Sequence, residues 1–135
     1  MEDVIKKYSV SSVLQKDVKK YGKKHLFDGN EETCWSSDEG SPQWIRVSFK
    51  KDVLLESVLF QFQGGFAGSN CEIEVGDKIV RTFIPENTNA IQEVTLSPPA
   101  AVSESEPVTI IFCKSTDFFG RIILYRLGFG IFDKE

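Results

Sequence analysis

Hydrophobic and polar residues alternate along most of the chain. In residues 43–50, Ile45, Val47 and Phe49 are separated by residues that point the other way in an extended chain, and residues 57–63 repeat this pattern. A period of two is typical of a β-strand with one face buried. The pattern therefore predicts two central strands in the first half of the chain.

Other segments extend the same interpretation. Residues 97–107 hold three prolines and predict a surface loop, whereas residues 21–27 favour a single helical turn. Five more runs are rich in β-branched and aromatic residues, namely 71–75, 78–84, 91–96, 108–114 and 121–129. About eight short strands at this spacing predict an all-β protein, an antiparallel sandwich or jelly roll of two sheets.

Composition limits the classes of function. The 135 residues fit one domain, residues 1–135, and the net charge of −4 argues against direct binding to nucleic acid or anionic lipid. We find no apolar stretch typical of a secretion signal or a membrane span. The three cysteines form no CxxC pair. We therefore expect a protein of the nucleus or cytoplasm, or both, that is not secreted.

Catalytic residues are scarce. His25 is the only histidine, and no neighbouring pattern marks a nucleophile that it could activate. Residues 116–121 read Thr-Asp-Phe-Phe-Gly-Arg, which superficially resembles the Asp-Phe-Gly motif of kinases. The chain lacks the other kinase motifs and is too short for a kinase domain. The sequence predicts a binding module that needs no cofactor and is not an enzyme.

The most informative segment is residues 23–49. It resembles the discoidin family, also called the coagulation factor 5/8 C-terminal type or galactose-binding-like domain. Residues 11–14 and 121–130 are similar to the first and last strands of that family, and the resemblance implies a discoidin-like jelly roll. The matching residues are Leu26, Phe27, Asp28, Gly29, Asn30, Thr33, Trp35, Ser36, Trp44, Ile45, Val47 and Phe49.

Four blocks, residues 21–28, 31–35, 61–66 and 116–121, resemble a small intracellular branch of this family. Its members associate with an orphan nuclear receptor. The resemblance implies a non-enzymatic protein-interaction module that represses receptor-driven transcription by hindering the receptor's binding to DNA response elements. Two alternatives remain open: a calcium-stabilised carbohydrate-binding module, and a scaffold subunit of a larger intracellular complex.

The Asp-Gly-Asn turn offers oxygen atoms for a cation. Asp28, Asn30 and Thr33 lie within six residues, and Ca²⁺ prefers oxygen ligands. The family resemblance implies a structural Ca²⁺ held by the Asp28 carboxylate, the Thr33 hydroxyl and backbone carbonyls near His25 and Asn30. The family often adds an acidic ligand from its last strand, where this chain has Leu127. Both a bound structural ion and an ion-free hydrogen-bonded turn remain open.

Aromatic residues in predicted loops are the candidate contacts with a partner. Phe118 and Phe119 either fill the core or face a partner from the rim of the domain, and Phe66 in its glycine-rich loop is either folded back or exposed. We predict that Tyr21, Phe66, Phe118, Phe119 and Arg121 form a partner-binding rim.

Two further surfaces have alternative interpretations. A carbohydrate site could be assembled from Phe66, Arg121, Gln43 and Asp38, although the sequence does not require one. Residues 16–24 hold five lysines in nine positions. Such a run is a solvated loop, a surface for an acidic partner, or a weak nuclear-import signal.

Overall fold

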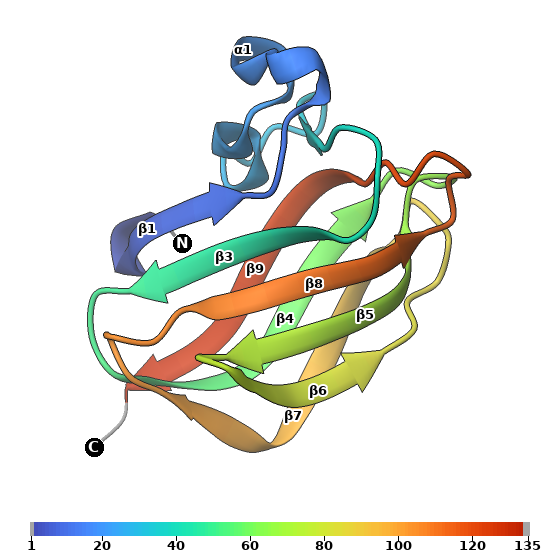
Figure 1. Ribbon diagram of the computed structural model, residues 1–135. Coiled ribbons are helices and arrows are strands. Elements are labelled where there is room, and N and C mark those ends of the chain that lie inside the picture. Colours follow the sequence, from blue (N-terminus) through green and yellow to red (C-terminus); the bar gives the residue numbers. More distant parts are fainter. Residues whose placement is uncertain (1, 134–135) are drawn as a thin grey trace.

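The computed structural model describes residues 2–133, in which two antiparallel sheets pack face to face (Figure 1). The all-β jelly roll expected from the sequence is confirmed. The strands are β1 (Ile5–Val10), β2 (Trp35–Ser36), β3 (Gln43–Phe49), β4 (Val53–Phe62), β5 (Gly68–Val75), β6 (Lys78–Phe83), β7 (Ile91–Val102), β8 (Val108–Ser115) and β9 (Ile123–Asp133). The helical turns are η1 (Glu2–Val4), η2 (Leu14–Lys16), α1 (Val18–Tyr21) and η3 (Lys23–Leu26).

Neighbours in the sheets are mostly distant in sequence. One sheet has the order β1-β3-β8-β5-β6 and the other β2-β9-β4-β7. The alternating residues Ile45, Val47 and Phe49 of β3 are fully buried between the sheets, as their period predicts. Trp35 and Phe112 pack together in the same core, with ring centroids 6.4 Å apart.

The predicted loop at residues 97–107 is wrong in part, because β7 continues to Val102. β7 is an edge strand that pairs only with β4, and its register shifts between the Ser57–Thr95 and Leu55–Ala100 pairs. Pro98 and Pro99 lie in this irregular stretch. Proline is tolerated at an edge strand or a bulge because its missing N–H breaks no central ladder bond.

The N-terminal region also differs from the expectation. The first strand is β1, and residues 11–14 lie after it, where the chain leaves the sheet for η2. The Ser11 and Ser12 hydroxyls instead bond the Gln43 side chain. The helical turn expected at residues 21–27 is present as η3. No helix within residues 2–133 is long and apolar enough to cross a membrane.

Candidate functional site

Four connections gather at one end of the sandwich, at the right of Figure 1. Antiparallel strands bring their alternate connections to the same edge, so segments far apart in sequence meet there. These connections are residues 37–42, 63–67, 84–90 and 116–122. We call them together the loop face.

Hydrogen bonds fix these loops to one another. The Gly40 N–H donates to the Phe119 carbonyl at 2.8 Å, and the Gly65 N–H donates to the Asn87 side chain at 2.7 Å. Gly120 has φ +89°, and a Cβ there would lie 2.6 Å from the Gly40 carbonyl oxygen. The loop face is therefore a preformed surface, since its tips are held by bonds across loops.

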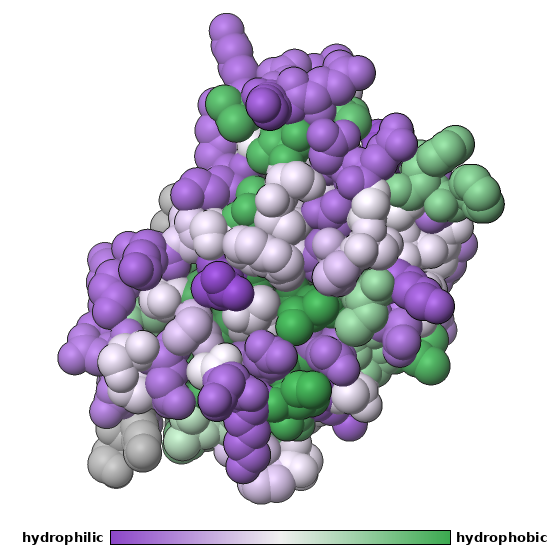
Figure 2. Space-filling view, viewed as in Figure 1, coloured by the Kyte–Doolittle hydropathy of each residue, from purple (hydrophilic) through white to green (hydrophobic). Residues whose placement is uncertain are grey.

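Phe118 and Phe119 form the exposed tip of the loop face. Their side chains are 93% and 60% exposed, and their rings meet edge to face at a centroid distance of 5.3 Å. Of the two interpretations left open by the sequence, the structure places both rings on the rim. In Figure 2, pale green hydrophobic side chains project at the upper right, where the β8–β9 connection lies in Figure 1. Two adjacent exposed phenylalanines are an apolar surface that a partner can cover.

Phe66 is folded back rather than projecting. It is partly buried, and the Arg121 guanidinium carbon lies 5.0 Å from its ring centroid. Ser115 and Asp117 hold the Arg121 backbone at 2.7 and 3.1 Å. The Arg121 Nε is buried and, within residues 2–133, has no hydrogen-bond partner. Phe66 and Arg121 thus form a half-buried pair at the base of the exposed tip.

Tyr21 does not share this surface. It ends α1, which projects from the top of the molecule in Figure 1, to the side of the loop face. The Lys20 ammonium lies 5.2 Å from the centroid of its ring. The structure thus brings together four of the five predicted rim residues, and Tyr21 lies apart because the segment between β1 and β2 forms its own helical layer.

Gln43, one of the four residues of the carbohydrate interpretation, is engaged within the protein. Gln43 is buried, and its amide nitrogen donates to the carbonyls of Gly40 and Asp38 at 2.9 and 3.1 Å. Its oxygen accepts from the Ser11 and Ser12 hydroxyls. Because every polar atom of this side chain is used internally, Gln43 links β3 to the loops rather than offering a hydrogen bond to a sugar.

The sequence interpretation missed two asparagines. The Asn87 and Asn89 side chains accept bonds from the Gly65 and Gly64 amides at 2.7 and 2.8 Å. They hold the glycine-rich loop in place across the loop face. The signal for them was present in the polar stretch between two predicted strands, but local sequence does not show which distant loop such a side chain will meet.

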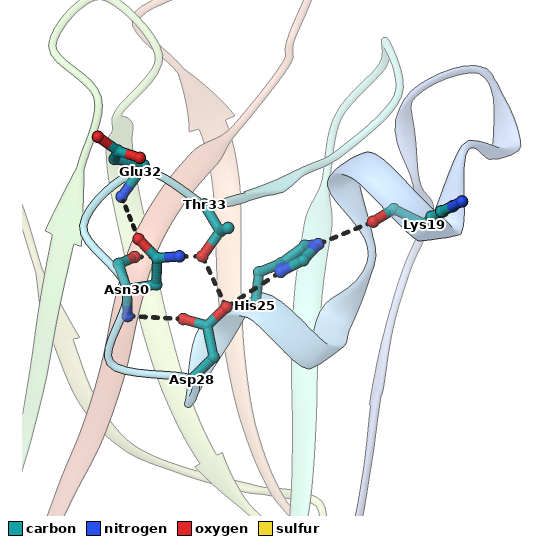
Figure 3. Close-up of polar contacts among 6 residues, drawn as sticks. All are labelled: Lys19, His25, Asp28, Asn30, Glu32 and Thr33. Atoms are coloured by element: carbon teal, nitrogen blue, oxygen red, sulfur yellow. Dashed lines mark hydrogen bonds and ion pairs between the residues drawn. The ribbon is translucent and has the colours of Figure 1, made fainter.

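A second group of polar residues surrounds the Asp-Gly-Asn turn (Figure 3). The Asp28 carboxylate accepts from the Thr33 hydroxyl at 2.6 Å and from the Asn30 N–H at 2.9 Å. The His25 Nδ1 lies 3.1 Å from the same carboxylate, and its Nε2 lies 3.0 Å from the Lys19 carbonyl oxygen. The turn is therefore closed by a continuous hydrogen-bonded network.

The partners of His25 define its role. An ionised carboxylate and a backbone carbonyl both accept hydrogen bonds, and the His25 ring lies between these two acceptors. Burial by itself would raise the pKa of the Asp28 carboxyl. The hydrogen bonds from Thr33, from the Asn30 amide and from His25, with the charge of His25, outweigh that effect and lower the pKa. The His25 ring thus joins η3 to the turn through its contacts with the Asp28 carboxylate and the Lys19 carbonyl.

These residues do not fit a calcium site. The Asp28 carboxylate already accepts three hydrogen bonds, and the Thr33 hydroxyl donates into it rather than facing outward. Leu127 is buried, and the guanidinium of the preceding residue, Arg126, lies 3.9 Å from the Glu31 carboxylate. Within residues 2–133 no three His, Cys, Asp or Glu side chains are grouped as metal ligands. The chemistry of this donor set favours the hydrogen-bonded turn.

Comparison with known proteins identifies relatives of this chain. The family model described as NedA-like, galactose-binding domain matches residues 25–116. The Nuclear receptor 2C2-associated protein of Danio rerio is 46% identical over 123 residues, covering 87% of this chain and 85% of the relative. The Homo sapiens protein of the same name is 42% identical over 124 residues, covering 87% and 86%.

Solved structures share the fold at low sequence identity. The family 32 CBM from C. perfringens NanJ, solved in complex with galactose, superposes with a TM-score of 0.75 at 18% identity and covers 91% of each chain. An F5/8 type C domain from Bacteroides fragilis superposes with a TM-score of 0.74 at 19% identity, covering 90% of this chain and 89% of the other. At this identity the similarity establishes the architecture alone.

Proposed function

Because the chain belongs to the NedA-like, galactose-binding domain family, and within it to the family of proteins named Nuclear receptor 2C2-associated protein, we propose that it is a non-enzymatic module that binds a nuclear receptor. The relatives' name supplies the class of partner. The exposed aromatic residues of the loop face support that face as the contact surface.

The observation that carries this proposal is the exposed pair of Phe118 and Phe119. Most of their apolar surface faces solvent, and the loop that presents them is held to Gly40 by backbone contacts. A loop whose backbone is already held in place loses less conformational entropy on binding, and phenylalanine is enriched at protein interfaces. Arg121 and Phe66 support the base of this anchor.

Repression of the receptor's transcriptional activity is the second part of the proposal. A protein bound over the receptor's DNA-contacting surface would compete with response elements. The net charge of −4 suits contact with a basic surface and disfavours contact with DNA. Asp38 and Glu39 add acidic groups to the loop face, in the connection whose Gly40 bonds the Phe119 carbonyl.

The proposed location is the nucleus or the cytoplasm, or both. Cys34, Cys71 and Cys113 are all unpaired thiols, which supports a reducing compartment. A nuclear receptor would be met in either place.

An affinity capture from nuclear and cytosolic extracts tests the proposal. The baits are the whole chain, a Phe118→Ser/Phe119→Ser variant, and a control variant with Ile79→Ser/Phe132→Ser. The control removes two exposed apolar residues that lie at the opposite end of the sheets. We expect the first and third baits to capture a nuclear receptor, identified by mass spectrometry, and the second to lose it.

Each other outcome points elsewhere. Release of captured proteins by free galactose would replace the proposal with a carbohydrate-binding module. Stable, stoichiometric recovery of a multisubunit assembly without a receptor would indicate a scaffold subunit. Equal capture by all three baits would show that the loop face is not the contact surface.

A further inference from the structure

A groove separate from the loop face lies between β1 and the helical segment that follows it. Val10, Val13 and Val18 form its apolar floor, and Lys19, Lys23 and Lys24 lie along its rim. The groove encloses about 510 Å³. Val10 and Val13 pack against the core, whereas Val18 is 64% exposed. The floor is thus an outward continuation of the core that stays open to solvent.

The walls of the groove are held in place. Gly22 joins α1 to η3, and a Cβ there would lie 2.2 Å from the Val18 carbonyl oxygen, so only glycine allows this approach. The His25 ring donates to the Lys19 carbonyl, which ties the far wall to α1. The Lys23 ammonium bonds the Tyr8 carbonyl of β1 at 2.7 Å. Contacts at both sides therefore keep the groove formed without an occupant.

The charge around the groove is opposite to that of the whole chain. Residues 16–24 hold five lysines and one aspartate, hence a net charge of +4, whereas the chain carries −4. The single aspartate, Asp17, caps α1 by accepting from the Lys20 N–H at 3.1 Å. In Figure 2, green apolar side chains lie among purple hydrophilic ones over α1 and the segment beside it. An occupant must suit both the cations and the apolar floor.

We propose that this groove binds an acidic segment of a partner protein, with apolar side chains in the groove and carboxylates beside the lysines. Charge complementarity favours an acidic partner, and the valine floor favours one that also has aliphatic or aromatic side chains. Nucleic acid has no such side chains to fill the floor, and the charge of the rest of the chain opposes a long polyanion. A membrane would need a wider apolar face, and the exposed aliphatic group here is Val18.

Selection of peptides on the whole folded chain tests this inference. A displayed library of random peptides is panned on the protein, and the selected sequences are synthesised with a fluorescent label. Their affinities are measured by anisotropy for the wild type, for Val18→Ser and for Lys19→Glu/Lys24→Glu. The matched controls are Ile79→Ser and Lys50→Glu/Lys78→Glu, which make the same changes at exposed residues away from the groove.

We expect the selected peptides to combine Asp or Glu with apolar residues and to bind more weakly as salt is raised. Each groove variant should weaken binding by about tenfold or more, and each control by less than about twofold. Selection of neutral or basic peptides, or equal losses in groove and control variants, would overturn the inference. A third result would also overturn it: no acidic peptide is selected, and the groove variants lose binding to a DNA duplex or to phosphatidylserine vesicles. That result would show that the groove is a general surface for polyanions.

Discussion

Replacement of Gly120 by alanine tests whether the loop face is held as tightly as the structure indicates. The added methyl group would meet the Gly40 carbonyl at 2.6 Å from its oxygen and 2.7 Å from its carbon. The Gly40 carbonyl cannot retreat easily, because its oxygen accepts from the Gln43 side chain at 2.9 Å and the Gly40 N–H is bonded to Phe119. The two loops must therefore separate.

A matched substitution isolates this steric effect. Gly65 has φ +92°, close to the +89° of Gly120, yet no described atom lies within 4 Å of where its Cβ would be. Both alanine variants suffer the penalty of a left-handed backbone, roughly 1–2 kcal/mol. Gly120→Ala adds an overpacking cost of about 1–3 kcal/mol. We expect losses in the free energy of unfolding of about 1–2 kcal/mol for Gly65→Ala and about 2–5 kcal/mol for Gly120→Ala.

Urea unfolding followed by tryptophan fluorescence measures both losses, since Trp35 is in the core and Trp44 on β3. The free energies of unfolding are extrapolated to zero urea with one common m value, the slope of free energy against urea concentration. For small proteins this slope is about 1–3 kcal/mol/M. The reasoning would be refuted if the free energies of unfolding of the two variants differed by less than about 0.5 kcal/mol. Effects of independent mutations add only to within about that amount. Gly120→Ala should also weaken receptor capture, as it displaces the loop that carries Phe118 and Phe119.

Three further predictions concern the core, the thiols and the Asp-Gly-Asn turn. Trp35→Phe leaves the Ser12 carbonyl without its 2.9 Å hydrogen bond from the indole N–H. The free energy of unfolding, measured by calorimetry, should therefore fall by about 1–3 kcal/mol. An unchanged value would contradict a stabilising contribution from this bond. Burial, with the neighbouring Cys113, raises the pKa of the Cys71 thiol to about 12. At neutral pH Cys71 should therefore stay protonated and react with a disulfide reagent only after unfolding. Fast labelling of Cys71 in the native protein, mapped by mass spectrometry, would contradict this. Since Asp28 is engaged by protein donors, millimolar Ca²⁺ or a chelator should leave the melting temperature unchanged, whereas an ion bound at a hundredfold excess over its Kd would add about 2.7 kcal/mol.

Local patterns determined much of the architecture. The alternation at residues 45–49 and 57–63 predicts strands because a pleated strand with one buried face needs apolar residues at every second position. The structure buries those residues between two sheets. A different rule, that prolines mark a loop, failed at residues 97–102. Proline is tolerated in a strand at an edge or a bulge, and the edge position of β7 is a property of the assembled sheet.

Only the tertiary structure decided how the candidate sites are built. The sequence could place Phe66 and Phe118 in loops, but which ring folds back depends on whether a residue such as Arg121 reaches it from another connection. Likewise, the oxygen atoms of Asp28 and Thr33 suggested a calcium site until His25 was found between the turn and the Lys19 carbonyl. The physical reason is the same in both cases. Strand and turn preferences act over a few neighbouring residues, whereas exposure and hydrogen-bond partners are set by groups that folding brings together from distant parts of the chain.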